Sequence, residues 1–255
     1  MLSPKYFEQY IEAQRSHWWF RGRERILRAF VGSVMPSQAR LRVADVGSGP
    51  GGPARALFPE GWLIAFDLKP QPLSAYAGTD GRVVADAAQM PCQAESLDVV
   101  CAFDILEHVD DDLLALQEWR RILVPGGWLI LSVPAYQALW SQHDVANAHR
   151  RRYRAEHLRS LLRRSGFTPV RITYFNTLLL PGVALVRWAE RVRGDVDGNI
   201  RIEQAELDLQ KRLPKWIERC CEEMLSLEAR WIRRRALPAG VSIGAIARAV
   251  RPTAE

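Results

Sequence analysis

Apolar positions along the chain follow two different periods. Near the N-terminus, Ile26, Leu27, Phe30 and Val31 have helical spacing, so residues 1 to about 38 are predicted to be helical. After Pro36, short apolar runs alternate with helical stretches at 113–122 and 156–165. The expected strands are residues 41–46, 63–67, 82–86, 97–103, 128–133 and 167–174. This alternation predicts a parallel sheet with helices on both faces.

The C-terminal part of the chain departs from this alternation. Residues 176 to about 236 have helical character, and an apolar run follows at 241–250. We predict that this run is a seventh strand paired with the sixth. The fold class is therefore α/β, a doubly wound, seven-stranded, mainly parallel sheet of Rossmann-like type. The expected domains are an N-terminal helical lid (1–38), a core (39–175), a helical insertion that shapes an acceptor site or an interface (176–238), and the last strand with a tail (239–255).

Composition sets broad limits on the function. The chain has 255 residues, of which 48% are hydrophobic and 25% charged, as in ordinary globular proteins. Its four cysteines lack zinc spacing and are expected to be reduced, which fits the cytoplasm. We see no signal core and no apolar run of roughly 18 residues, so only peripheral contact with the inner membrane face is left open. The net charge of +6 suits anionic lipid, nucleic acid or a phosphorylated substrate, or reflects solvated helix faces.

The strongest chemical signal is a glycine-rich turn after the first strand. Asp45 is followed by Gly47, Gly49 and Gly51, which let the backbone turn sharply and approach a ligand closely. The spacing is G-x-G-x-G, which differs from the dinucleotide fingerprint. S-adenosylmethionine (SAM) has a cationic amine and sulfonium and no pyrophosphate, so a carboxylate beside the loop suits it.

Acidic residues also follow the next two strands. Asp67, at the end of the second strand, is placed to accept hydrogen bonds from both ribose hydroxyls of a cofactor. Asp86, after the third strand, is placed to reach the adenine amino group. Each acid alone could be a strand-end cap, but their occurrence at consecutive strand ends favours a cofactor site.

These motifs make residues 40–175 resemble the class I SAM-dependent methyltransferases. Residues 103–109 (FDILEHV) and 123–127 (LVPGG) resemble later motifs of that family. No Asn/Asp-Pro-Pro-Tyr/Phe motif follows the fourth strand, which disfavours DNA amine and glutamine methylases. The resemblance implies SAM as cofactor, bound by Asp45, Gly47, Gly49, Gly51, Asp67, Leu68, Asp86, Ala87 and Phe103.

The loop after the fifth strand should hold the acceptor, because ligands gather at the carboxyl ends of strands. His143 and His149 are the candidate general bases, and Asp144 could orient one of them. Arginines there suit a carboxylate or phosphate. The candidate acceptor contacts are Trp19, Tyr136, Trp140, Asp144, Arg151, Arg152 and Tyr153. The alternative is a structural ion pair with capping histidines, and the spacing demands no metal.

The same loop carries the pattern His-Asp-x4-His-x-Arg-Arg-Tyr, starting at His143. Together with residues 17–20 (HWWF) and 237–242 (LPAGVS), it resembles a bacterial small-molecule subgroup, methyltransferase type 11/12-like. Members of this subgroup look like tailoring enzymes for lipid-linked, polysaccharide-related or secondary metabolites. Residues 18–20 are interpreted as a lid over the cofactor or as plain helix packing.

Three functions therefore remain open. The first is SAM-dependent methylation of a small or lipid-like acceptor, for which nucleic acid is disfavoured as a partner. The second is an RNA or protein methyltransferase, motivated by the basic charge. The third is a SAM-binding partner subunit without transferase activity. A closed apolar pocket under the insertion would favour the first, and a charged surface groove the second.

Overall fold

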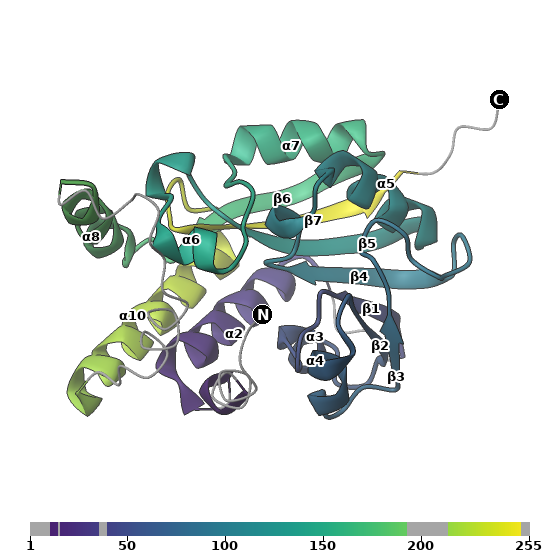
Figure 1. Ribbon diagram of the computed structural model, residues 1–255, viewed down its shortest axis with the longest axis horizontal. Helices are drawn as coiled ribbons and strands as arrows, with labels where there is room; N and C mark the ends of the chain where they lie inside the picture. Colours follow the sequence, from purple (N-terminus) through teal and green to yellow (C-terminus); the bar gives the residue numbers. More distant parts are fainter. Residues whose placement is uncertain (1–10, 15, 36–39, 193–213, 251–255) are drawn as a thin grey trace.

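The fold is built on one seven-stranded sheet, seen edge-on in Figure 1. The computed structural model describes residues 11–14, 16–35, 40–192 and 214–250. The strands are β1 (Arg42–Val46), β2 (Trp62–Asp67), β3 (Gly81–Val84), β4 (Leu97–Phe103), β5 (Leu123–Pro134), β6 (Phe167–Phe175) and β7 (Ser242–Ala249). Their order is β3-β2-β1-β4-β5-β7-β6, with β1 to β5 paired in parallel and β7 antiparallel to both neighbours. The predicted fold class is confirmed.

Helices cover both faces of this sheet (Figure 1). The described helices are α2 (Trp18–Val31), α3 (Pro53–Leu57), α4 (Pro70–Ala75), α5 (Asp112–Ile122), α6 (Gln142–Ala146), α7 (Ala155–Arg164), α8 (Leu180–Val192) and α10 (Lys215–Arg234), with 3-10 turns η1 (Leu106–His108) and η2 (Gln137–Leu139). Helices α5 and α7 lie over one face, whereas α2, α3, α4 and α10 lie over the other. No helix within the described ranges is both long and apolar enough to span a bilayer.

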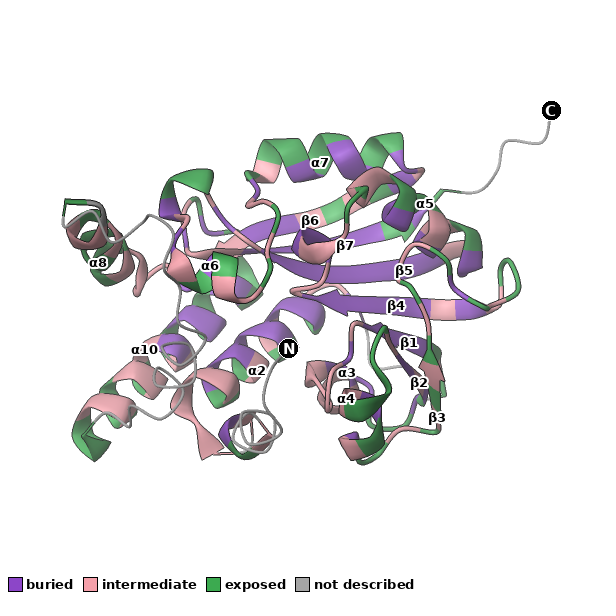
Figure 2. Cartoon of the chain, viewed as in Figure 1, coloured by how far each residue is buried: buried purple, intermediate pink, exposed green. Residues whose placement is uncertain are grey.

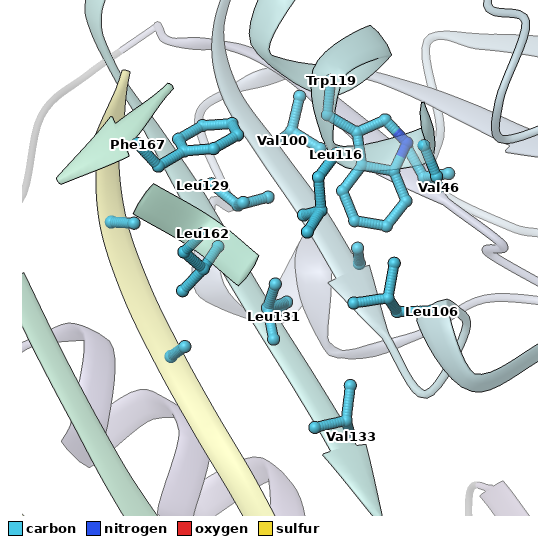
Figure 3. Packing of buried hydrophobic residues seen from close by; sticks show 14 of the residues in the cluster. Val46, Val100, Leu106, Leu116, Trp119, Leu129, Leu131, Val133, Leu162 and Phe167 are labelled. Atoms are coloured by element: carbon cyan, nitrogen blue, oxygen red, sulfur yellow. The ribbon is translucent and has the colours of Figure 1, made fainter. Parts of the chain in front are cut away.

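The core on this face of the sheet forms where the apolar sides of α5 and α7 pack against apolar strand residues. Leu116 and Trp119 of α5 and Leu162 of α7 pack against Leu129 and Leu131 of β5 (Figure 3). All five side chains are fully buried. Apolar side chains point to both faces of β4 and β5, which explains why these central strands read as nearly continuous apolar runs. Figure 2 shows the buried strands between helices whose outer faces are exposed.

The opposite face is covered by a pair of helices from the two ends of the chain. Ile26 and Leu27 of α2 share a core with Leu225 and Ile232 of α10. Gly22 lets the two helices approach closely, because a Cβ atom at this position would lie 2.2 Å from Leu225 Cδ1. The predicted N-terminal helix and the C-terminal insertion therefore form one packed layer at this site.

Several boundaries differ from the sequence prediction. The fifth strand begins at Leu123 and not at Trp128, because Leu123 already pairs with Leu97 before a bulge in the ladder. The third strand ends at Val84, and Asp86 instead forms an isolated bridge with Gln89. The seventh strand pairs with β6 as predicted, and it also pairs with β5, so it lies between them. Within the predicted insertion, residues 193–213 lie outside the described residues, as do residues 1–10 of the predicted lid.

Candidate functional site

The glycine-rich turn joins β1 to α3 and is held against the end of β2. Gly47, Gly49 and Gly51 have φ values of +66°, +57° and +122°, a region that favours glycine. The Gly49 N–H donates to Asp67 Oδ2 at 2.9 Å, and the Ser48 N–H donates to the Phe66 carbonyl oxygen at 3.0 Å. The turn is thereby fixed beside the carboxylate that the sequence assigned to the ribose.

Asp45 is a buried carboxyl group at the end of β1. Burial raises its pKa from 3.8 to about 7, although a hydrogen bond from Tyr76 and the nearby Arg23 act in the opposite direction. The Tyr76 hydroxyl donates to Asp45 Oδ2 at 3.0 Å. A buried, half-titrated acid is best compensated by a cation, so this position suits a ligand with a positive charge.

A second polar cluster joins α2 to the carboxyl ends of β4 and β5. The Arg23 guanidinium donates to Asp104 Oδ2 and, at 3.0 Å, to Ser132 Oγ. Ser132 Oγ donates to Asp104 Oδ1 at 2.8 Å, which completes a closed triangle. The guanidinium also lies 5.4 Å from the centre of the Trp19 ring. This cluster fixes α2 at the edge where the predicted cofactor site lies.

A cavity of about 520 Å³ opens between these groups. The predicted cofactor residues on its wall are Asp45, Gly47, Gly49, Gly51 and Phe103. Residues not predicted for cofactor binding also form the wall, among them Phe20, Arg23, Tyr76 and Asp104. A Cβ atom at Gly49 would meet nothing within 4 Å, so the turn presents bare backbone to open space. A buried acid beside an open glycine turn fits a cationic cofactor such as SAM.

The other predicted cofactor residues lie at the strand ends beyond this cavity wall. Asp67 Oδ1 accepts a hydrogen bond from the Lys69 N–H at 3.0 Å, and Leu68 is 66% exposed. Asp86 Oδ1 accepts from the Ala88 N–H at 2.8 Å, and the Ala87 carbonyl accepts from Trp119 Nε1 at 2.9 Å. Both carboxylates retain acceptor capacity, since each oxygen has two lone pairs.

The loop after β5 is built on a buried ion pair. Asp144 is fully buried, and its Oδ1 and Oδ2 accept from Arg152 Nε and Nη2 at 2.7 and 2.9 Å. Ser141 completes a capping box with Asp144 at the start of α6. Tyr153 is buried in the core, where its hydroxyl donates to Asp112 at 3.0 Å. The structure therefore gives Asp144, Arg152 and Tyr153 roles in holding this loop together.

The remaining predicted acceptor residues are more accessible. Tyr136 has a φ of +55° and stacks on Tyr174 with ring centres 5.2 Å apart. Trp140 is half-buried at the end of η2. Arg151 donates to the carbonyl oxygens of Val109 and Asp110 at 3.2 and 2.6 Å, so it ties the loop to the segment after β4.

The two predicted bases occupy different environments. His149 is half-buried, and its Nδ1 lies 2.9 Å from Asp144 Oδ1. The rings of His149 and His108 meet edge to face with centres 4.7 Å apart. His143 is on the exposed side of α6, and its ring centre is 6.4 Å from that of His149. Asp144 thus orients His149 and does not hydrogen-bond His143.

A second cavity of about 430 Å³ lies between α2, α8 and α10. Its lining is mostly apolar, with Trp18, Trp19, Leu179, Val183, Val186 and Val241 among its residues. Trp19 lies between the two cavities, because its ring contacts Phe20 with centres 5.0 Å apart and lies against Arg23. Of the predicted residues, Trp19 is therefore the one that joins the cofactor cavity to the apolar cavity.

Comparison with known proteins identifies the central part of the chain. Residues 44–131 match the family model described as a methyltransferase domain. An uncharacterized methyltransferase of Mycobacterium sp. (strain KMS) is 31% identical over 112 residues, which cover 42% of this chain and 44% of that protein. The 27-O-demethylrifamycin SV methyltransferase of Amycolatopsis mediterranei is 33% identical over 109 residues, covering 38% and 40%. The chain thus matches less than half the length of these curated relatives.

Solved structures share the fold over a longer stretch. A putative methyltransferase of Bacillus halodurans has a TM-score of 0.57 at 19% identity, covering 89% of this chain and 99% of that one. A complex of a putative methyltransferase and a methyltransferase activator from Haloferax volcanii gives 0.60 at 18% identity, covering 98% and 100%. These likenesses therefore extend beyond residues 44–131.

Proposed function

We propose that the protein transfers the methyl group of SAM to a small or lipid-like acceptor, since residues 44–131 match a methyltransferase domain. The observation that carries this proposal is the apolar cavity beside the cofactor cavity. The relative that acts on a demethylated rifamycin supports a small-molecule acceptor.

The apolar cavity has the character of a small-molecule site. Ligand pockets in proteins are mostly apolar, with a few polar groups that fix orientation. Here the wall is mostly apolar, and Trp18, Asn176 and Arg187 are among its residues with polar side-chain groups. Such a wall suits an acceptor with an apolar body and one or two polar groups.

The chain's own residues would divide the work of the reaction. Bound SAM supplies an electrophilic methyl group on a cationic sulfur. Asp45 and the glycine turn would hold the cationic cofactor, while Trp19, which lines the apolar cavity and lies against Arg23 of the cofactor cavity, would position the acceptor beside it. An oxygen or carbon acceptor must also lose a proton, and His149 is the better placed of the two predicted bases because Asp144 orients it.

The outer surface of α10 supports peripheral contact with an anionic membrane as a second proposal. A groove of about 660 Å³ there is lined by Leu227, Trp231, Arg230, Arg233, Arg234 and Arg235. Aromatic and basic side chains together suit the interface of an anionic bilayer. None of these residues lines the cofactor cavity, so the groove offers less support for an RNA or protein acceptor. Flotation with phosphatidylglycerol vesicles, compared with phosphatidylcholine vesicles, tests this contact.

The acceptor proposal is tested by following labelled methyl from SAM into a host-cell extract that is separated into organic and aqueous phases. Label in the organic phase or in small aqueous molecules is the expected result, and label only in macromolecules would contradict the proposal. Trp19→Ala should lower transfer while leaving the SAM dissociation constant within about twofold. The matched control is Trp216→Ala, because this tryptophan is 69% exposed on α10 and lines neither cavity. Equal effects of the two variants would contradict the role of the apolar cavity.

A further inference from the structure

Glu107 is a buried acid that the proposed methyl transfer does not use. It lies in η1, directly after β4, and its exposed fraction is 0%. Neither of its carboxyl oxygens has a hydrogen-bond partner. Buried polar groups are nearly always paired, and an unpaired buried carboxyl costs several kcal/mol as a rough order of magnitude. Such a group in a folded protein points to a ligand that completes it.

Two imidazole rings lie beside this carboxyl group. One oxygen of Glu107 and one nitrogen each of His108 and His149 lie within 4.8 Å of one another. The rings of His108 and His149 meet edge to face, with centres 4.7 Å apart. Two imidazoles and one carboxyl group form a ligand set typical of catalytic zinc and other divalent transition metals.

The orientation of His149 also matches a metal ligand. Its Nδ1 lies 2.9 Å from Asp144 Oδ1, so Nε2 is the ring nitrogen left for a metal ion. Metal-ligating histidines commonly donate their other N–H to a carboxylate in this way, which fixes the tautomer and the ring. Asp144 is itself fixed by Arg152.

The two segments that carry the three side chains are tied together by their backbones. The Arg150 N–H donates to the Glu107 carbonyl oxygen at 2.8 Å, and Arg150 Nε donates to the His108 carbonyl oxygen at 3.0 Å. The nearby cations are used elsewhere, since Arg152 pairs with Asp144 and Arg150 with Asp110. Neither arginine pairs with Glu107, so its carboxyl group stays available to another ligand.

From this geometry we propose that Glu107, His108 and His149 bind one divalent transition-metal ion, with Zn²⁺ as the model ion. Three protein ligands leave at least one coordination position open. Asp104, three residues before Glu107, is part of the wall of the cofactor cavity. The use of the metal site depends on the proposed function: the open position would bind a hydroxyl oxygen of the acceptor, the metal would lower the pKa of that hydroxyl, and solvent water would take its proton. In that state His149 is a ligand and does not act as a base.

Calorimetric titration of the chelator-treated full chain with Zn²⁺ tests the site, in the absence of SAM and acceptor. We expect about one strong site per chain. Loss of a residue that only orients a ligand typically costs roughly 10- to 100-fold in affinity, so Glu107→Gln and His108→Asn should each weaken binding at least tenfold. Controls are His157→Asn, an exposed histidine on α7, and the double variant Cys220→Ser/Cys221→Ser, which removes the adjacent thiols.

Each outcome decides the proposal. Tight binding that survives in the controls and is lost in Glu107→Gln and His108→Asn supports it. Absence of binding to the wild-type chain, or binding lost only in a control, overturns it. Circular dichroism melts check folding, and Glu107→Gln is expected to be at least as stable as wild type because it removes a buried ionisable group. Because no methyl transfer is measured, failure of the metal site and failure of the proposed function are distinguishable.

Discussion

The glycine turn offers a matched pair of substitutions that separates steric clash from backbone strain. Gly47 and Gly49 both have left-handed φ values, +66° and +57°. A Cβ atom at Gly47 would lie 2.5 Å from Ile105 Cγ1 and 2.6 Å from Ile105 Cδ1, whereas one at Gly49 would meet nothing within 4 Å. Gly47→Ala therefore introduces both backbone strain and a steric clash with Ile105, whereas Gly49→Ala introduces backbone strain alone.

The magnitudes follow from these two terms. A left-handed conformation costs an L-residue roughly 1–2 kcal/mol, and this cost applies to both variants. Forcing an extra carbon into a packed site adds roughly 1–3 kcal/mol, which applies to Gly47→Ala alone. We expect Gly47→Ala to lower the free energy of unfolding by about 2–5 kcal/mol. For Gly49→Ala we expect about 1–2 kcal/mol.

The assay is urea unfolding without cofactor, followed by circular dichroism. Combining Gly47→Ala with Ile105→Ala should restore part of the loss, which a double-mutant cycle measures as a coupling energy. Gly49→Ala should instead weaken SAM binding more than it lowers stability, because its new methyl group enters the cofactor cavity. Equal losses of stability in the two single variants, or no coupling with Ile105, would refute this reasoning.

Three further predictions concern the same edge of the sheet. Asp67→Ala should weaken SAM binding measured by calorimetry, and unchanged affinity would contradict the cofactor assignment. SAM affinity should rise as the pH is raised through about 7, because the ionised form of Asp45 attracts the cationic cofactor. The apo-protein should change in the opposite sense: the raised pKa of Asp45 contributes stability that is fully present below its ordinary value of 3.8 and is lost as the pH rises through about 7. Asp45→Asn should remove the pH dependence of both SAM affinity and apo-protein stability. If either pH dependence persists in this variant, another group causes it. Finally, His149→Ala should abolish turnover on the true acceptor while His143→Ala retains most of it; the reverse result would exchange their roles.

The sequence predicted the parts of the fold that depend on local pattern. The fourth strand is found at Leu97–Phe103 as expected, because its side chains are buried on both faces and no polar break obscures its limits. The turn at Gly47 was also predicted from the sequence, because its left-handed backbone conformation favours glycine. The fifth strand was found, but its start was predicted at Trp128 and not at Leu123, because Pro125-Gly126-Gly127 looks like a stop, while the ladder accommodates it with a bulge.

The parts of the site that depend on tertiary contact were harder to read. Arg23 had a usable signal, because it lies three and four residues before Ile26 and Leu27 and so interrupts the apolar stripe of α2. Tyr76 gave no such signal, since only the fold brings it to Asp45. Tyr153 shows the opposite error: it belongs to a motif-rich loop, yet its side chain is buried in the core. Proximity in the sequence did not distinguish residues that hold this loop from residues that face a ligand.

The antiparallel placement of β7 has a consequence for how such a protein can diversify. Strand β6 ends, and β7 begins, at the same edge of the sheet, since Phe175 pairs with Ser242. The described ends of the segment between them, Asn176 and Val241, therefore lie close to this edge of the sheet. Exchanging the segment would alter the apolar cavity through Leu179, Val183 and Val241, and the part of α10 that packs on α2 would have to be kept. Chimaeras that exchange this segment between related chains should bind SAM with the affinity of the recipient and select acceptors in the manner of the donor.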